Sequence, residues 1–395
     1  MSGLSTRAVE ALWRPALVHV MAIDFMLIGG GHILIPAIAL YISARGGSES
    51  LVGIVASVFM FCSIGLRPVA GLAVDIAGEK RVLLLSIGII ALAGAVLPIG
   101  LAFSGLIAVR LIQGVGWAFY SPASNTLAAE LIPRSRRGEG IGYASMVRNA
   151  GVALGSVAGL LLAERGHFDL AFAAAAVTTF AAWVIAWRLR GTRHRPGGPY
   201  TVSVRGLVEP RAINPSVVSA AMTFVMGGMM TFVPLDAQAR DIGSAAAFFL
   251  VFTGVLMVMR PLSGRLSDRL HSRGALILPG LALTALSAWT LAFTEGPFTL
   301  WLAALFWGAG FGTAQPVLRA MVLDRTPPEK WGAANATSMV LYDLGLALGP
   351  LALGLVASHT GIAAMFGLSS LMPLLAIVLV LRTGLHREVS SQTRS

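Results

Sequence analysis

Long apolar runs, separated by short polar segments, dominate the pattern of hydrophobic and polar positions along the chain. At 1.5 Å per residue, each run is long enough to cross a lipid bilayer as a helix. The runs are residues 16–42, 50–74, 82–103, 105–130, 141–163, 170–188, 214–236, 245–266, 275–293, 298–323, 332–357 and 362–381. The pattern predicts an all-α membrane protein with twelve transmembrane helices.

The composition agrees with a chain that lies in the lipid bilayer. Its 395 residues have a mean hydropathy of +0.79, and only 12% are charged, which is too little polar surface for a soluble protein of this size. The 45 glycines fit closely packed helices, because small residues let helix backbones approach one another in membranes.

The net charge of +11 raises the question of a nucleic-acid partner, but the cations are distributed in another way. If both termini are cytoplasmic, 21 of the 29 lysines and arginines fall in cytoplasmic segments and three in outer loops. This asymmetry is the usual signal of membrane topology, so we predict both termini inside and no nucleic-acid partner.

The longest polar segment lies near the middle of the chain and is rich in glycine, proline and arginine. It predicts a basic cytoplasmic linker at 190–213 between an N-terminal six-helix bundle, 1–189, and a C-terminal six-helix bundle with a short tail, 214–395. Its basic residues act chiefly as the topology signal, with contact to anionic lipids as the alternative.

The two halves repeat one another. Arg67 and Pro68 recur as Arg260 and Pro261, a shift of 193 residues. Further matches at similar offsets are Gly71 with Gly264, Asp75 with Asp268, Gly114 with Gly308, Pro122 with Pro316, Gly151 with Gly345 and Gly155 with Gly349. Because six spans is an even number, both copies have the same orientation and form parallel repeats about an axis normal to the membrane.

The segment GLAVDIAGEKR, residues 71–81, resembles the loop between the second and third spans of the major facilitator superfamily. The matching residues are Gly71, Asp75, Gly78, Lys80 and Arg81, and the second copy keeps Asp268 and Arg269. Glu79 departs from the pattern, where the family has a cation. The resemblance implies the major facilitator fold and a gating role for these residues; the alternative is a solvated loop that only sets topology.

A second motif resembles the drug/proton antiporter branch of that family. Arg110, Gln113, Gly114 and Gly116 match its fourth span, in which the arginine is linked to proton transfer. The fifth span keeps the glycines of the antiporter pattern, but Ser156 stands where proline is usual.

Ionisable groups at membrane depth are costly, so they are candidates for proton coupling. The candidates are Asp24, Arg110, Asp343 and His32. Burial favours the neutral form of a carboxyl group, which suits a proton carrier, and a nearby guanidinium opposes that effect. The alternatives are permanent ion pairs for the two acids, a salt bridge or a substrate anchor for Arg110, and a simple hydrogen bond for His32.

A substrate cavity is expected between the halves, lined by polar, aromatic and methionine side chains. The predicted lining is Gln113, Trp117, Ser121, Asn149, Met226, Met230, Trp307, Gln315, Arg319, Asn335 and Tyr342. Methionines adapt to varied apolar substrates, although ordinary helix packing explains them equally. The moderate number of polar residues favours an amphipathic organic compound over a sugar.

These observations predict a secondary transporter of the cytoplasmic (inner) membrane, not an enzyme. The leading hypothesis is proton-coupled export of small amphipathic organic compounds by antiport; the alternative is a proton-coupled uptake symporter for a sugar, an organic acid or another metabolite. The proton gradient would be the driving force, so no cofactor is expected. A monomer suffices for the mechanism, and the partners are lipid, substrate and protons.

Overall fold

The computed structural model describes residues 12–133, 136–189, 209–269, 273–327 and 330–385, and the regular structure within these ranges is helical. The helices of the first half are α1 (Pro15–Ala44), α2 (Glu49–Ala77), α3 (Glu79–Ala95), α4 (Phe103–Leu131), α5 (Arg137–Ala163) and α6 (Phe168–Arg188). Those of the second half are α7 (Pro210–Arg240), α8 (Ala245–Arg269), α9 (Ile277–Ala292), α10 (Pro297–Asp324), α11 (Trp331–Thr360), α12 (Ile362–Ser369) and α13 (Leu371–Thr383). Short 3₁₀ turns are Leu97–Ile99 and Arg273–Leu276.

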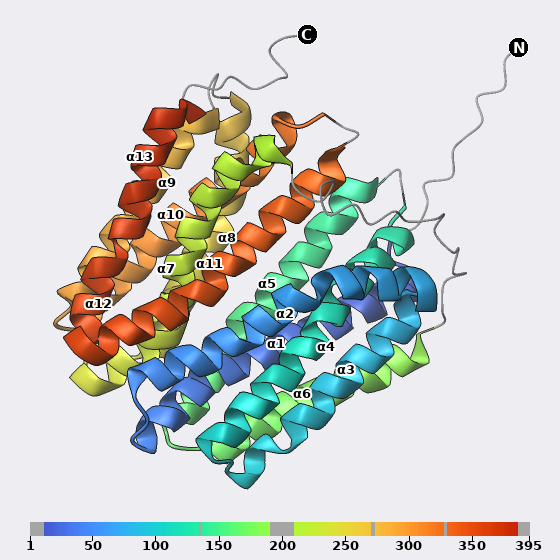
Figure 1. Ribbon diagram of the computed structural model, residues 1–395, viewed down its shortest axis with the longest axis horizontal. Coiled ribbons are helices and arrows are strands. Elements are labelled where there is room, and N and C mark those ends of the chain that lie inside the picture. Colours follow the sequence, from blue (N-terminus) through green and yellow to red (C-terminus); the bar gives the residue numbers. More distant parts are fainter. Residues whose placement is uncertain (1–11, 134–135, 190–208, 270–272, 328–329, 386–395) are drawn as a thin grey trace, which may run out of the picture.

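The helices form two bundles with the same internal packing (Figure 1). In the first bundle, α1 packs on α5 and α6, and α4 packs on α2 and α3. In the second, α7 packs on α11 and α13, and α10 packs on α8 and α9. Each contact therefore recurs six spans later, which confirms the two parallel repeats predicted from the sequence.

Eleven of the twelve predicted spans are long and apolar enough to cross a membrane. The exception is α10, which is 28 residues long but whose tryptophans, glycines, threonines, Gln315 and Arg319 lower its hydropathy. Its neighbours α8 and α9 cover much of its surface. The last span is divided into α12 and α13 near Pro373, because proline lacks the N–H that would continue the helix ladder.

The boundary between the halves differs slightly from the predicted one. Helix α7 already begins at Pro210, inside the predicted linker 190–213. The remainder of that linker, 190–208, lies outside the described residues.

Glycines bring α1 and α5 into backbone contact. A Cβ atom on Gly155 would lie 2.2 Å from the carbonyl oxygen of Gly29, and one on Gly159 would lie 2.4 Å from that of Ile33. In the second repeat, a Cβ on Gly349 would lie 2.1 Å from the carbonyl oxygen of Phe224 in α7. A side chain at these positions would push the paired helices apart.

We expect Gly155→Val to destabilise the first bundle by about 1–3 kcal/mol, the usual cost of overpacking. Gly142→Val is the matched control on the same helix, because nothing lies within 4 Å of a Cβ atom at Gly142. Thermal unfolding of the purified variants in detergent measures the difference. Equal midpoints for the two variants would mean that α1 and α5 are not in close contact at Gly155.

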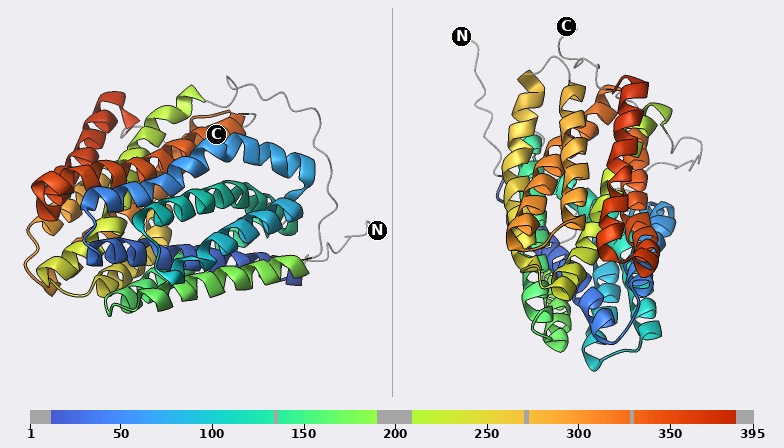
Figure 2. Two further views of the ribbon diagram at one scale, coloured as in Figure 1. Left: turned by 60° about the horizontal axis from the view of Figure 1, so that its bottom comes forward. Right: turned by 90° about the vertical axis from the view of Figure 1, so that its left-hand side faces the viewer.

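The two bundles meet mainly through three helix pairs: α2 with α11, α1 with α7, and α5 with α8. At the end where α1 leads into α2, a Cβ on Gly53 would lie 2.3 Å from the carbonyl oxygen of Pro350 in α11. We call this end, marked by the loops 45–48 and 241–244, the joined end. Figures 1 and 2 show α2 lying along α11, while the two bundles diverge toward the opposite end.

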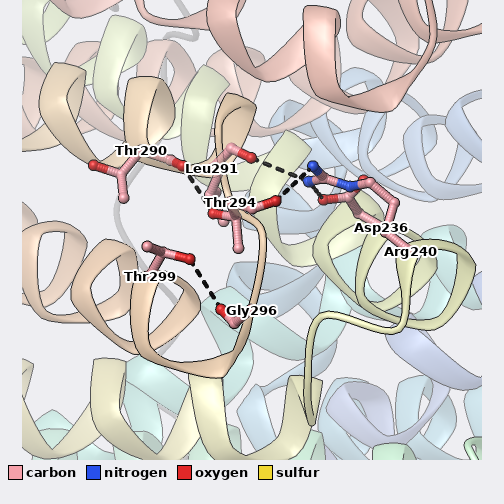
Figure 3. A network of polar contacts seen from close by, with 7 residues as sticks. All are labelled: Asp236, Arg240, Thr290, Leu291, Thr294, Gly296 and Thr299. Atoms are coloured by element: carbon pink, nitrogen blue, oxygen red, sulfur yellow. Dashed lines mark hydrogen bonds and ion pairs between the residues drawn. The ribbon is translucent and has the colours of Figure 1, made fainter.

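Near the joined end, Arg240 links α7 to the C-terminal end of α9 through hydrogen bonds (Figure 3). Its Nε donates to Asp236 at 2.8 Å, and a second nitrogen also pairs with that carboxylate. The same guanidinium donates to the carbonyl oxygens of Thr294 at 2.9 Å and Leu291 at 3.1 Å. A cation at the C-terminal end of a helix satisfies carbonyls that have no partner within it. These contacts all lie within the second bundle.

Candidate functional site

Asp343 of α11 forms an ion pair with Arg67 of α2, so the contact joins the two bundles. Both side chains are largely buried, with 12% and 19% of their surface exposed respectively. Asp343 lies twelve residues from the start of its helix, or about 18 Å at the α-helical rise. An ion pair at this depth, between helices of different bundles, would be altered by any movement of one bundle against the other.

Asp24 of α1 has its partners within its own bundle. Ser124 of α4 donates to its carboxylate at 2.5 Å, and Tyr120, one turn earlier, donates to the same oxygen. Arg148 of α5 pairs with the other oxygen at 3.1 Å and also reaches Asn125. Asp24 is only 2% exposed. This network ties three helices of one bundle together.

Arg110 was expected to act on the nearby acids, but its contacts differ from that expectation. It lies 4.3 Å from the centre of the Phe59 ring and donates to Gln113 at 3.0 Å, whereas the cation beside Asp24 is Arg148. Its side chain is buried, and its Nε has no hydrogen-bond partner among the described residues. His32 donates from Nδ1 to a backbone carbonyl one turn earlier, at 2.9 Å.

A cationic cluster lies in the second bundle beside the Arg67–Asp343 pair. The guanidinium carbon of Arg319 is 5.6 Å from the centre of the Tyr342 ring. Arg260 of α8 lies within electrostatic range of both Arg319 and Tyr342. Asp343, next to Tyr342 in α11, is the acid in this group.

The other predicted cavity residues divide by burial. Trp117, Ser121, Asn149, Met226 and Asn335 are partly or well exposed, as cavity-lining residues would be. Gln113, Met230, Trp307 and Gln315 are buried. Trp307 stacks on Phe252 with ring centres 3.8 Å apart, and Gln315 accepts a hydrogen bond from Ser219 at 3.0 Å. In this arrangement both side chains pack between helices instead of lining a cavity.

The predicted gating loop is only partly described. Gly78 has φ +84° and forms the junction between α2 and α3, which explains why a glycine is needed there. Gly71 lies in α2 with open space around it, and Lys80 and Arg81 lie in the first turn of α3. The side chains of Asp75, Asp268 and Arg269 lie outside the described residues.

Glu164, just beyond the membrane-spanning part of α5, makes a contact between bundles at the joined end. Its Oε1 accepts a hydrogen bond from the backbone N–H of Ala245, at the start of α8, at 3.2 Å. Partial burial raises the pKa of Glu164, although the N–H groups of Ala245 and Ala246 and the charge of Arg165 oppose that shift.

We expect the joined end to hold more firmly at acidic pH. Burial in the joined structure raises the pKa of Glu164, and separation of the bundles would expose this carboxyl to water and return its pKa to the ordinary range. Protons would then bind preferentially to the joined state, and its stability relative to the separated state would fall as the pH rises through the raised pKa. Glu164→Gln should remove this dependence. Spin-label distances between His167→Cys and Ser244→Cys in a Cys62→Ser background would measure it, with exposed Glu295→Gln as control. An unchanged pH profile in Glu164→Gln would exclude this residue.

Comparison with known proteins places the chain in a family. The sequence model of the Major Facilitator Superfamily matches residues 20–322 and 241–394. The chain belongs to the Major Facilitator Superfamily. It is therefore a membrane transporter and not an enzyme.

Two relatives carry names that describe drug resistance. The Multidrug resistance protein MdtG of Yersinia enterocolitica is 25% identical over 370 residues, covering 87% of this chain and 86% of that protein. The Quinolone resistance protein NorA of Staphylococcus aureus is 25% identical over 143 residues, or 36% of this chain and 37% of that protein. Among solved structures, the nucleoside transporter NupG superposes with a TM-score of 0.78 at 12% identity, covering 93% of this chain and 99% of that chain. At this identity the likeness shows the fold alone.

Sequence reasoning missed the role of Arg67. This arginine is visible in the repeat, where it matches Arg260, yet only the folded chain brings it against Asp343. The pairing of Asp24 with Tyr120 and Arg148 was missed for the same reason, since these partners lie 96 and 124 residues away in sequence.

Proposed function

We propose that this transporter exports small amphipathic organic compounds in exchange for protons. The names of MdtG and NorA support efflux as the direction of transport. The units that move are the two bundles, 1–189 and 214–395, joined by the basic linker. The protein acts as a monomer in the inner membrane with both termini in the cytoplasm, and the proton gradient drives it without a bound cofactor.

The Arg67–Asp343 ion pair is the observation that carries this proposal. With the predicted topology, the joined end faces outward and the diverging end faces the cytoplasm. The structure then corresponds to an inward-facing state in which substrate enters from the cytoplasm. Alternating access requires the bundles to separate at the joined end, where α2 and α11 are now in contact.

Proton binding and this movement are linked through Asp343. Arg67 stabilises the ionised carboxylate while α2 and α11 are together. Substrate that enters from the cytoplasm must therefore supply the free energy that breaks this pair as the bundles separate. In the outward-facing state the carboxyl group lacks Arg67 and takes up a proton from outside, and when the bundles rejoin, Arg67 again favours the carboxylate and the proton leaves to the cytoplasm. The gating residues Asp75, Lys80, Arg81, Asp268 and Arg269 would hold the cytoplasmic ends together in that state.

Proton movement in sealed liposomes containing the purified protein tests the proposal. The liposomes hold an acid interior and a pH-sensitive dye, and candidate amphipathic compounds are added outside one at a time. Antiport predicts proton efflux as a compound enters. Loss of this efflux in Arg110→Ala would show that the arginine takes part in proton coupling. Proton flow in the same direction as the compound would instead establish the symport alternative.

A further inference from the structure

The interior of the described helices contains more positive than negative charge. Seven Asp, Glu, Lys or Arg residues lie five or more positions from the ends of their helix. They are Asp24, Arg67, Arg110, Arg148, Arg260, Arg319 and Asp343. Both aspartates are already paired, Asp24 with Arg148 and Asp343 with Arg67. Three arginines are thus left without an ion pair among the described residues.

Two of these three arginines lie together. Arg260 of α8 and Arg319 of α10 are near enough to repel one another, and both are in electrostatic range of the Tyr342 ring. Arg319 is exposed and Arg260 is partly exposed. An exposed guanidinium facing hydrocarbon at this depth would be very costly, so these side chains face water between the bundles. Arg110, in contrast, is enclosed against Phe59.

The internal repeat explains why Arg260 has no acidic residue as an ion-pair partner among the described residues. Arg260 corresponds to Arg67, and Asp343 corresponds to Asn149 at the repeat offset of 194. One pair of positions therefore holds Arg67 and the acidic Asp343. The equivalent pair holds Arg260 and the neutral Asn149. The negative charge that completes the pair at α2 and α11 is missing from the equivalent pair at α8 and α5.

We propose that the substrate supplies the negative charge: Arg260 and Arg319 bind an anionic group of the transported compound, with its apolar part beside Tyr342. Guanidinium groups bind carboxylate, sulfonate and phosphate oxygens through paired, charge-assisted hydrogen bonds. A positively charged compound would meet two cations that have no ion pair among the described residues, because Asp343, which lies in electrostatic range of Arg319, pairs with Arg67. The inference rests on the proposed function only in treating the space between the bundles as the path of the substrate. It narrows the class of transported compound from amphipathic compounds in general to amphipathic anions.

Binding of two xanthene dyes of similar size tests the charge preference without any transport. Fluorescein is an anion and rhodamine 123 is a cation, and fluorescence anisotropy would report their binding to the full chain in phosphatidylcholine nanodiscs. We expect fluorescein to bind at least tenfold more tightly than rhodamine 123. Equal binding, preference for the cation, or no binding of fluorescein below millimolar concentration would overturn the proposal.

Substitutions locate the site. Each of Arg260→Gln and Arg319→Gln should weaken fluorescein binding by about tenfold, the size of one lost hydrogen bond to a charged group. Arg265→Gln is the matched control, because it removes an exposed arginine from another face of α8 and should change affinity less than twofold. Arg319→Lys keeps the charge and provides a second variant if Arg319→Gln does not fold; it should retain part of the affinity. Equal losses in Arg265→Gln and Arg319→Gln would overturn the site.

The anion could also be the phosphate of a lipid headgroup. Repeating the titration in nanodiscs that contain phosphatidylglycerol separates the two sources. Competition that disappears in Arg260→Gln would identify lipid phosphate as an occupant of the proposed site, and no competition would identify a soluble anion. The dye-binding measurements need no proton gradient, so they are independent of the liposome test of antiport. The anion site can be disproved while antiport is confirmed, and antiport can be disproved while the dyes bind as expected.

Discussion

Replacing Asp343 with asparagine is expected to abolish proton-driven uphill transport while preserving exchange of substrate between the two sides. Asparagine has nearly the same shape but cannot carry a proton between states, and it no longer attracts Arg67 as an ion. Uphill accumulation of substrate under an imposed pH gradient should fall to the level of empty liposomes. Counterflow of labelled against unlabelled substrate, which needs no proton movement, should persist.

Two further variants make this prediction specific. Asp169→Asn removes an exposed acid at the start of α6 and should leave uphill transport unchanged. The exchange Arg67→Asp with Asp343→Arg restores an ion pair between α2 and α11 but moves the carboxylate to the other bundle. It should keep the contact between α2 and α11 without recovering normal proton coupling. Full uphill transport by Asp343→Asn would show that this residue carries no essential proton.

The sequence predicts the helices well because each span is a local feature. Length and apolar character follow from consecutive residues, and the repeat of Arg67 as Arg260 relates the two bundles directly. The apolar criterion fails at α10 because its glycines, tryptophans, Gln315 and Arg319 lower its hydropathy, although its length and its place in the repeat still identify it as a span.

The partners of the buried charges could not be predicted in this way. Asp24 and Asp343 look equivalent in sequence, as lone acids deep in apolar runs. In the fold, one pairs within a bundle and the other pairs between bundles. That difference arises from contacts across about 100 residues or more, and for Asp343 also from the relative position of the bundles. Under the proposed alternating access, it separates a group whose surroundings change during transport from one whose surroundings stay constant.

Replacing Asp24 with alanine is therefore expected to affect folding more than proton coupling. The change leaves Arg148 in the first bundle without its carboxylate and removes the acceptor shared by Tyr120 and Ser124. Removing one partner of a buried ion pair typically costs about 3–5 kcal/mol, and the partial exposure of Arg148 places this pair at the lower end of that range. Thermal unfolding in detergent should show a large fall in midpoint. Ser124→Ala, which deletes one donor and leaves the ion pair intact, should cost about 1 kcal/mol.

Asp24→Asn distinguishes the structural role from a role in proton transfer. Asparagine keeps an acceptor oxygen for Tyr120 and Ser124, so this variant should be more stable than Asp24→Ala. Since Asp24 and its partners move together as one bundle, the folded protein should still couple protons to transport. A fully stable Asp24→Asn protein that had lost uphill transport would reverse the assignment, because Asp24 would then be a proton carrier despite its fixed partners. Loss of coupling in both Asp24→Asn and Asp343→Asn would indicate one carrier in each bundle.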